Sequence, residues 1–358
     1  MKKNKLERII IASALIIFII IIDILAYIEN NKFTSVEVSI IPKLEVIPIK
    51  IEINTINKLL AIDKSLFISY INGAKNKTIK NLIKEELENE YYYLLNNSVP
   101  NDIVRDALES SILYVFTTDK NRMIFKNSID YRTRIKKITS MLLAIAKIET
   151  GIQFKYNYRI FSRTGAYGRY QVIPTTLTSI ALELELKNIL KFSEFKYEKE
   201  KTFFQLYQKY SKNDYFLYKD KLVQKIVQNV QTNRYLKFCK MMNKKYDFFL
   251  NKRLNHMKYS NKNTFEFLNK QLKKNTYSRY DYSSKILDFM RDPVNQGYVS
   301  LFILEDIYNR ENNKSNNEAV LVFNTLKYYN NDRRIVSNKE YRNIYADFSS
   351  KVYYSYLQ

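Results

Sequence analysis

Glycine is scarce in this chain, and its distribution is the strongest constraint on the fold. The 358 residues include 5 glycines and 5 prolines, so few turns can depend on these residue types. Three of the glycines and one of the prolines fall within residues 151–174. We expect this stretch to need positive φ angles or close backbone approach, and we expect functional residues there. From about residue 55 onward, apolar residues recur at helical spacing, which predicts a mainly α-helical protein.

The composition excludes several kinds of site. His256 is the sole histidine and Cys239 the sole cysteine, so a multi-histidine metal site, a thiolate zinc cluster and an internal disulfide are excluded. Five glycines are too few for a Walker loop or a dinucleotide fingerprint. We therefore expect no metal and no cofactor, and we expect Cys239 to be a buried packing residue.

The chain is strongly basic, with 59 Lys and Arg residues, 36 Asp and Glu residues and a net charge of +23. A surplus of this size favours polyanionic partners such as nucleic acid, anionic lipid or an acidic cell wall. Codon drift in an AT-rich genome explains the charge equally well, because Lys, Asn, Ile and Tyr are abundant together. The charge alone therefore identifies no partner.

Residues 1–29 are predicted to be a cytoplasmic start and a transmembrane anchor. Residues 9–28 are apolar except for Asp23, and about 20 apolar residues span a bilayer as a helix. Four basic residues precede them, which predicts a single-pass anchor in the inner (cytoplasmic) membrane and a periplasmic remainder. A cleavable signal peptide is the alternative, although it needs a short apolar core and small residues before the cleavage site.

Residues 30–125 are predicted to be a membrane-proximal spacer or accessory region. Residues 33–53 alternate apolar and polar side chains in places, and Pro42 and Pro48 interrupt them. This pattern predicts a short strand pair or an extended spacer. Residues 101–118 fit an amphipathic helix that begins after Pro100.

One glutamate lies on the apolar face of a predicted helix over residues 132–149. Ile135, Ile138, Leu142 and Ile145 recur at helical spacing, and Glu149 falls with them within an arc of about 80°. Burial and the negative end of the helix both disfavour the charged form of a carboxyl group at this position. Glu149 is therefore a candidate general acid. The alternative is that it turns outward or pairs with a lysine.

The stretch that follows Glu149 carries a family motif, formed by Ser162, Gly165, Ala166, Gly168, Gln171 and Pro174. It resembles the catalytic core of lytic transglycosylases of the soluble (SLT) type, which are relatives of goose-type lysozyme. In that family, Glu-Ser is followed by the motif Ser-x-x-Gly-Ala-x-Gly-Leu-Met-Gln. A hydrophobic residue, a variable residue and a proline come next. Here Thr150 replaces the serine, and Arg169 and Tyr170 replace Leu-Met. We expect these substitutions to modify the site without abolishing it.

A second stretch resembles the C-terminal half of the same domain. Asp292, Pro293 and Asn295 match the family's Asp-Pro-x-x-Asn, and an apolar helix follows. Phe323 and Asn324 stand at the family's Tyr-Asn, but no glycine follows Asn324. Val299 replaces a usual glycine. The resemblance therefore predicts a lysozyme-like SLT catalytic domain over 126–186 and 286–345.

Residues 187–285 are predicted to be a helical insertion between the two halves. They hold 24 Lys and Arg residues, 8 Asp and Glu residues, a net charge of +16, and 11 tyrosines. The insertion is either a lobe that grips anionic glycan with tyrosines as stacking faces, or a basic helical segment whose tyrosines are ordinary core residues.

The resemblance implies cleavage of the β-1,4 bond between N-acetylmuramic acid and N-acetylglucosamine in peptidoglycan. Glu149 would protonate the glycosidic oxygen and then deprotonate the muramoyl 6-hydroxyl, which closes a 1,6-anhydro ring. Ser162 and Gln171 would bind substrate, Gly165 and Gly168 would let the backbone approach the sugar, and Phe323 and Asn324 would lie at the far wall of the cleft.

The expected partners are glycan strands, the membrane through residues 9–28, and proteins of a flagellar, secretion or division machine. A water-using muramidase and an inactive wall-binding scaffold are the alternatives. A nucleic-acid binder is disfavoured because the chain is predicted to be exported.

Overall fold

The structure is a computed structural model that describes residues 54–94, 99–150, 160–187, 189–190, 192, 221–260, 279–329 and 339–357. These residues are mainly helical, as the sequence predicts. The β-type pairing among them consists of two isolated antiparallel bridges within residues 161–172. The predicted anchor at 9–28 and the predicted strand pair or spacer at 33–53 lie outside the described residues. Among the described helices, none has both the length and the apolar character needed to cross a membrane.

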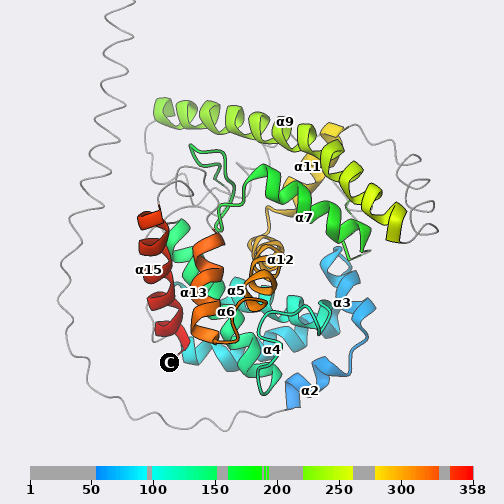
Figure 1. Ribbon diagram of the computed structural model, residues 1–358, viewed down its shortest axis with the longest axis vertical. Helices are drawn as coiled ribbons and strands as arrows, with labels where there is room; N and C mark the ends of the chain where they lie inside the picture. The colour runs from blue at the N-terminus through cyan, green and yellow to red at the C-terminus, as the bar shows by residue number, and fades with distance from the viewer. Residues whose placement is uncertain are drawn as a thin grey trace, which may run out of the picture. The chain divides into compact units, whose positions relative to one another are not determined.

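The described helices are labelled in Figure 1. In chain order they are α2 (Asn54–Leu60), α3 (Lys64–Ile71), α4 (Lys77–Leu94), α5 (Asn101–Thr117), α6 (Tyr131–Glu149), α7 (Pro174–Leu186), α9 (Lys221–Ser260), α11 (Arg279–Phe289), α12 (Pro293–Asn312), α13 (Glu318–Tyr329) and α15 (Lys339–Leu357). The helices predicted over 101–118 and 132–149 are confirmed as α5 and α6.

Three of these helices, α3, α6 and α12, begin at aspartates whose side chains cap them. Asp130 accepts a hydrogen bond from the backbone N–H of Thr133 at 2.7 Å and starts α6. Asp292 accepts one from the N–H of Val294 at 2.9 Å, and Pro293 follows as the first residue of α12. An aspartate cap satisfies an N–H that has no partner within the helix, and proline at the first position has no N–H to lose.

Helix α12 lies at the centre of the described helices and packs against α5, α7 and α13. Helix α6 packs against α5 and α15, and α9 crosses α7 and α11 (Figure 1). Residues 51–358 form one compact unit. Helix α5, which falls in the region predicted to be a spacer or accessory segment, therefore belongs to the same core as α6 and α12.

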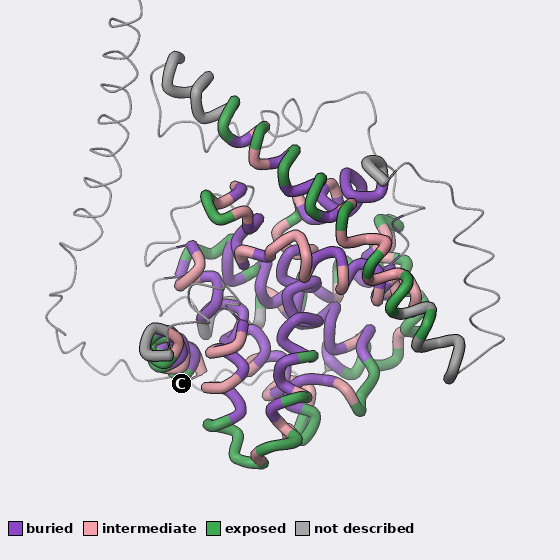
Figure 2. Tube along the Cα trace, turned by 45° about the horizontal axis from the view of Figure 1, so that its top comes forward, coloured by how far each residue is buried: buried purple, intermediate pink, exposed green. Residues whose placement is uncertain are grey.

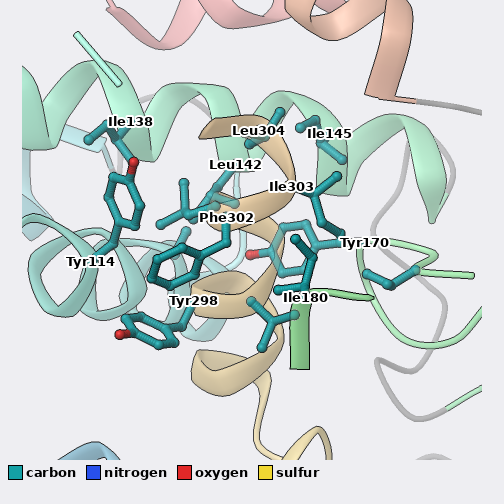
Figure 3. Close-up of a cluster of buried hydrophobic side chains, with 14 of the residues drawn as sticks. Tyr114, Ile138, Leu142, Ile145, Tyr170, Ile180, Tyr298, Phe302, Ile303 and Leu304 are labelled. Carbon is teal, nitrogen blue, oxygen red and sulfur yellow. The ribbon is translucent and has the colours of Figure 1, made fainter. Parts of the chain in front are cut away.

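The core is formed by aliphatic and aromatic side chains from α5, α6, α7 and α12, together with Tyr170 from the segment before α7 (Figure 3). The apolar stripe predicted on α6 is confirmed, because Ile135, Ile138, Leu142 and Ile145 are all buried. Burial of a large apolar side chain stabilises a fold by about 1.5–3 kcal/mol. Figure 2 shows the buried centre, whereas much of α9 is exposed.

Three tyrosines among the described residues of the insertion pack against the core. Tyr235 and Tyr282 are buried, and the ring of Tyr246 lies 4.7 Å from that of Tyr282. The hydroxyl of Tyr235 lies 3.1 Å from that of Ser284. Cys239 is buried, as predicted, and burial raises the pKa of its thiol to about 12. These three tyrosines therefore act as ordinary packing residues.

A carboxyl group is buried in the core between α5 and α12. Glu305 accepts a hydrogen bond from the hydroxyl of Tyr114 at 2.9 Å, and Nε of Arg122 lies 3.0 Å away. Burial raises the pKa of Glu305 from 4.5 to about 7, against the opposing effects of Tyr114 and Arg122. The folded chain therefore binds this proton more tightly than the unfolded chain does.

The substitution Glu305→Gln is expected to flatten the pH dependence of stability. With a raised folded-state pKa, the contribution of Glu305 is fully present below about pH 4.5 and is lost as the pH rises through about 7. Removing the titrating group should abolish up to about 3 kcal/mol of this decline in the free energy of unfolding. Urea titrations across this pH range test it, with the exposed Glu88→Gln as control. Equal pH slopes in the wild type and the Glu305 variant would contradict the prediction.

Candidate functional site

Glu149 is the last residue of α6, and its carboxylate faces a cleft. The helix ends at Thr150, whose N–H donates to the carbonyl of Ala146 at 3.1 Å. Glu149 is half-buried, and its Oε1 accepts a hydrogen bond of 2.8 Å from the hydroxyl of Tyr345 on α15. The sequence predicted that Glu149 lies on the same face of α6 as the apolar stripe, and its half-buried position agrees with this prediction.

The cleft has a volume of about 1460 Å³. Its walls come from the end of α6, the segment 162–173, the first turns of α7, one face of α9, and residues of α12, α13 and α15. Of the predicted site residues, the structure brings Glu149, Ser162, Gly165 and Gln171 together in its lining. These four residues come from two segments of the chain, the end of α6 and the loop before α7.

The segment from Ser162 to Gln171 is a tightly bonded pair of turns. The N–H of Ser162 donates to the carbonyl of Ala166 at 2.7 Å, and the N–H of Ala166 donates to Oγ of Ser162 at 2.9 Å. Gly165 has φ +88°, and Gln171 has φ +48°. The side-chain amide of Gln171 donates to the carbonyl of Gly168 at 2.7 Å. A non-glycine residue in the left-handed region costs about 1 kcal/mol or more, and such strain is often found at functional sites.

Gly168 has the positive φ expected of it, but it does not line the cleft. Its φ is +79°, and a Cβ at this position would lie 2.4 Å from Oε1 of Gln296 on α12. That oxygen accepts the N–H of Arg169 at 2.8 Å, and the amide of Gln296 donates to the carbonyl of Met290 at 2.7 Å. Gly168 therefore allows the loop to pack closely against α12. The resemblance had instead predicted that Gly168 lets the backbone approach the sugar.

The substitution Gly168→Ala is expected to destabilise the fold by about 3 kcal/mol, through the left-handed backbone and the overlap with Gln296. Gly165→Ala is the matched control, because Gly165 also has a positive φ but open space at its Cβ position. We expect it to cost only about 1 kcal/mol. Chemical denaturation measures both. Equal losses would show that the contact with Gln296 does not restrict this position.

Arg169 and Tyr170, where the chain departs from the family motif, tie the loop to the core. Nη1 of Arg169 donates to Oδ2 of Asp106 on α5 at 3.0 Å, and both side chains are buried. The carbonyl of Tyr170 accepts a hydrogen bond of 3.0 Å from the hydroxyl of Tyr329 on α13. An ion pair and a buried ring thus stand where the family has two apolar residues.

Phe323 and Asn324 lie on α13 and are not among the residues that line the cleft. The ammonium of Lys327 lies 5.9 Å from the centre of the Phe323 ring. The residues of α13 that do line the cleft are Lys327, Tyr328 and Tyr329, about one helical turn further on.

The lining of the cleft is predominantly basic. Among its described residues, three are acidic, namely Glu149, Asp306 and Glu311. Seven are basic, namely Arg163, Arg234, Lys237, Arg310, Lys314, Lys327 and Arg342. A concave surface with this balance attracts anionic ligands.

The acidic residues of the lining have partners on neighbouring side chains. Glu311 is paired with Lys314 at 2.9 Å and with Arg310 at 3.3 Å. Asp306 lies 3.3 Å from Nη2 of Arg122. Glu149 accepts a hydrogen bond from the hydroxyl of Tyr345.

The sequence analysis missed Tyr345 and the cations of α9. Tyr345 lies 196 residues from its partner Glu149, and no motif marks it. Arg234 and Lys237 belong to the insertion, and the sequence shows that this insertion is rich in basic residues. Their place in the cleft depends on the packing of α9 against α7.

In comparisons with known proteins, no family model, no curated protein and no solved structure matches the chain. In the part of the chain that the structure describes, no group of three or more His, Cys, Asp or Glu side chains is placed to hold a metal ion. The functional argument therefore depends on the motif residues and on the geometry of the cleft.

Proposed function

We propose that this chain is a membrane-anchored lytic transglycosylase with a lysozyme-like SLT domain, which cleaves the β-1,4 bond between N-acetylmuramic acid and N-acetylglucosamine in peptidoglycan. The observation that carries the proposal is the position of Glu149. It ends a buried helix, faces a cleft that it shares with Ser162, Gly165 and Gln171, and is hydrogen-bonded to Tyr345. The anchor is proposed from residues 9–28 of the sequence.

The chemistry requires one carboxyl group that first donates and then accepts a proton. Glu149 gives its proton to the glycosidic oxygen as the bond from that oxygen to C1 of the muramoyl residue breaks. The resulting carboxylate takes the proton of the muramoyl 6-hydroxyl, whose oxygen bonds to C1. The products are a free 4-hydroxyl on the leaving sugar and a 1,6-anhydro ring, and no water is consumed.

The hydrogen bond from Tyr345 supports this assignment. It is made to Oε1 of Glu149 at 2.8 Å and holds the carboxyl group in place at the cleft. A hydroxyl that donates to a carboxylate also stabilises the charge left after the first proton transfer. Tyr345 is therefore proposed as a positioning residue, and Ser162 and Gln171 as substrate-binding residues.

The other acidic residues of the cleft favour a transglycosylase over a water-using muramidase. Most glycosidases need a second carboxylate as a nucleophile or as a base for water. Asp306 and Glu311 are already engaged in ion pairs with neighbouring cations. A single-carboxylate mechanism needs neither.

The proposal is tested by incubating the full-length protein, in detergent, with purified peptidoglycan and measuring the products by mass spectrometry. Muropeptides with 1,6-anhydro ends are expected. Reducing ends would instead identify a muramidase. Binding of the wall by folded protein without any product would identify an inactive scaffold.

The substitution Tyr345→Phe is expected to lower kcat about 10- to 100-fold with little change in KM. The lost hydrogen bond is to a charged group, and such bonds are worth about 1.5–3 kcal/mol. Tyr356→Phe is the matched control, since it removes a buried hydroxyl from the same helix that has no hydrogen-bond partner. Steady-state kinetics on soluble glycan strands measure both variants. Equal kcat values for the two would remove Tyr345 from the mechanism.

A further inference from the structure

The wall of the cleft opposite α12 and α13 is built partly by the insertion. Helix α9 contributes Arg234, Lys237, Phe238, Met241 and Phe249 to the lining. The insertion is therefore part of the cleft itself, and it presents both cations and apolar side chains to the lining.

Arg163, Arg234 and Lys237, here called the basic wall, lie where the 162–171 loop meets α9. Arg163 and Lys237 are exposed, and Arg234 is half-buried. Nη1 of Arg234 donates to the carbonyl of Phe161 at 2.9 Å, which fixes its guanidinium against the loop. Burial lowers the pKa of Arg234, and the charge of Arg163 lowers it further. The two guanidinium groups are thus close enough to repel each other, and an anion bound between them would relieve this repulsion.

The two walls of the cleft differ in their charge balance. At the end of α12 and just after it, Arg310 and Lys314 pair with Glu311 and are partly neutralised by it. Among the described residues, the loop and α9 contribute no Asp or Glu to the lining. The positive charge of the cleft is therefore concentrated on the basic wall.

We propose that Arg163, Arg234 and Lys237 bind the carboxylates of the stem peptides carried by the glycan strand, so that the enzyme selects peptide-bearing strands over neutral glycan. This inference rests on the proposed function. The glycan backbone presents its anionic groups where peptides are attached, beside the muramoyl residue that Glu149 would act on.

The apolar residues of the same wall favour a peptide over a uniformly charged polymer. Phe238 and Met241 lie one helical turn or less from Lys237, and all three line the cleft. A wall that places apolar side chains beside cations fits a chain that carries both aliphatic side chains and carboxylates. A polyphosphate chain would leave the apolar surface unmatched.

The test measures equilibrium binding by the full-length Glu149→Gln protein in detergent, which does not consume the ligand. The ligands are three soluble oligosaccharides of equal length: a peptide-bearing strand, the same strand with its carboxylates amidated, and a neutral N-acetylglucosamine oligomer. The test variant adds Arg163→Gln and Lys237→Gln. The matched control adds Lys240→Gln and Lys244→Gln, which remove the same charge from exposed positions of α9 outside the cleft lining.

We expect the peptide-bearing strand to bind about tenfold more tightly than the amidated strand. The test variant should lose this difference, while the control keeps it. Equal binding of the two strands, or equal losses in the test and control variants, would overturn the inference. If wild-type protein still forms anhydro products in that case, the proposed function stands without it. If no strand binds and no anhydro product forms, both are wrong.

Discussion

The substitution Glu149→Gln is expected to reduce the release of anhydromuropeptides by at least about a thousandfold, because it removes the group that both donates and accepts the proton. Glutamine has nearly the same shape, and its amide oxygen can still accept the hydrogen bond that Tyr345 donates to Oε1. The fold and the binding of peptidoglycan should therefore be preserved. The rate of anhydro product formation, normalised to folded protein, measures the effect.

The control for this substitution is Glu88→Gln, at an exposed glutamate of α4 that does not line the cleft. It changes the net charge of the chain by the same amount and should retain the full rate. A Glu149→Gln protein that is folded and works within tenfold of the wild type would show that another group supplies the proton.

The second large effect concerns the ion pair that fixes the cleft loop. Replacing Arg169 by leucine leaves the carboxylate of Asp106 buried without the guanidinium that lies 3.0 Å from it. Removing one partner of a buried pair typically costs about 3–5 kcal/mol. We therefore expect Arg169→Leu to lower the free energy of unfolding by this amount, as measured by urea denaturation.

Two further variants separate the ion pair from general effects of the substitution. Arg105→Leu removes an exposed arginine that lies 3.8 Å from the same carboxylate, and it should cost less than about 1 kcal/mol. Adding Asp106→Leu to Arg169→Leu should recover much of the lost stability, since apolar pairs often replace buried ion pairs without loss. If Arg169→Leu costs no more than Arg105→Leu, the pair does not hold the loop.

The features that the sequence predicted correctly are local. Helix α5 follows from its amphipathic spacing and its start signal at Pro100, and α6 follows from its apolar spacing. The orientation of Glu149 follows from helical geometry on α6. The clustering of glycines in residues 151–174 predicted positive φ angles there, and Gly165 and Gly168 have them. These features depend on residues within a few turns of one another, so a single sequence carries enough information to predict them.

The features that the sequence did not predict depend on contacts between distant segments. Tyr345 reaches Glu149 across 196 residues, and Arg169 reaches Asp106 across 63. The partner of Gly168 proved to be Gln296 on α12 rather than a sugar. Tertiary packing decides such contacts, and no local spacing rule specifies them.

The most direct test of the proposed function is digestion of peptidoglycan by the wild-type protein in water enriched in heavy oxygen. An intramolecular attack by the muramoyl 6-hydroxyl takes no oxygen from the solvent, so the cleaved strands should carry 1,6-anhydro ends and no label. A hydrolase would instead place a solvent oxygen at C1. Labelled reducing ends as the main product would contradict the transglycosylase mechanism proposed for Glu149.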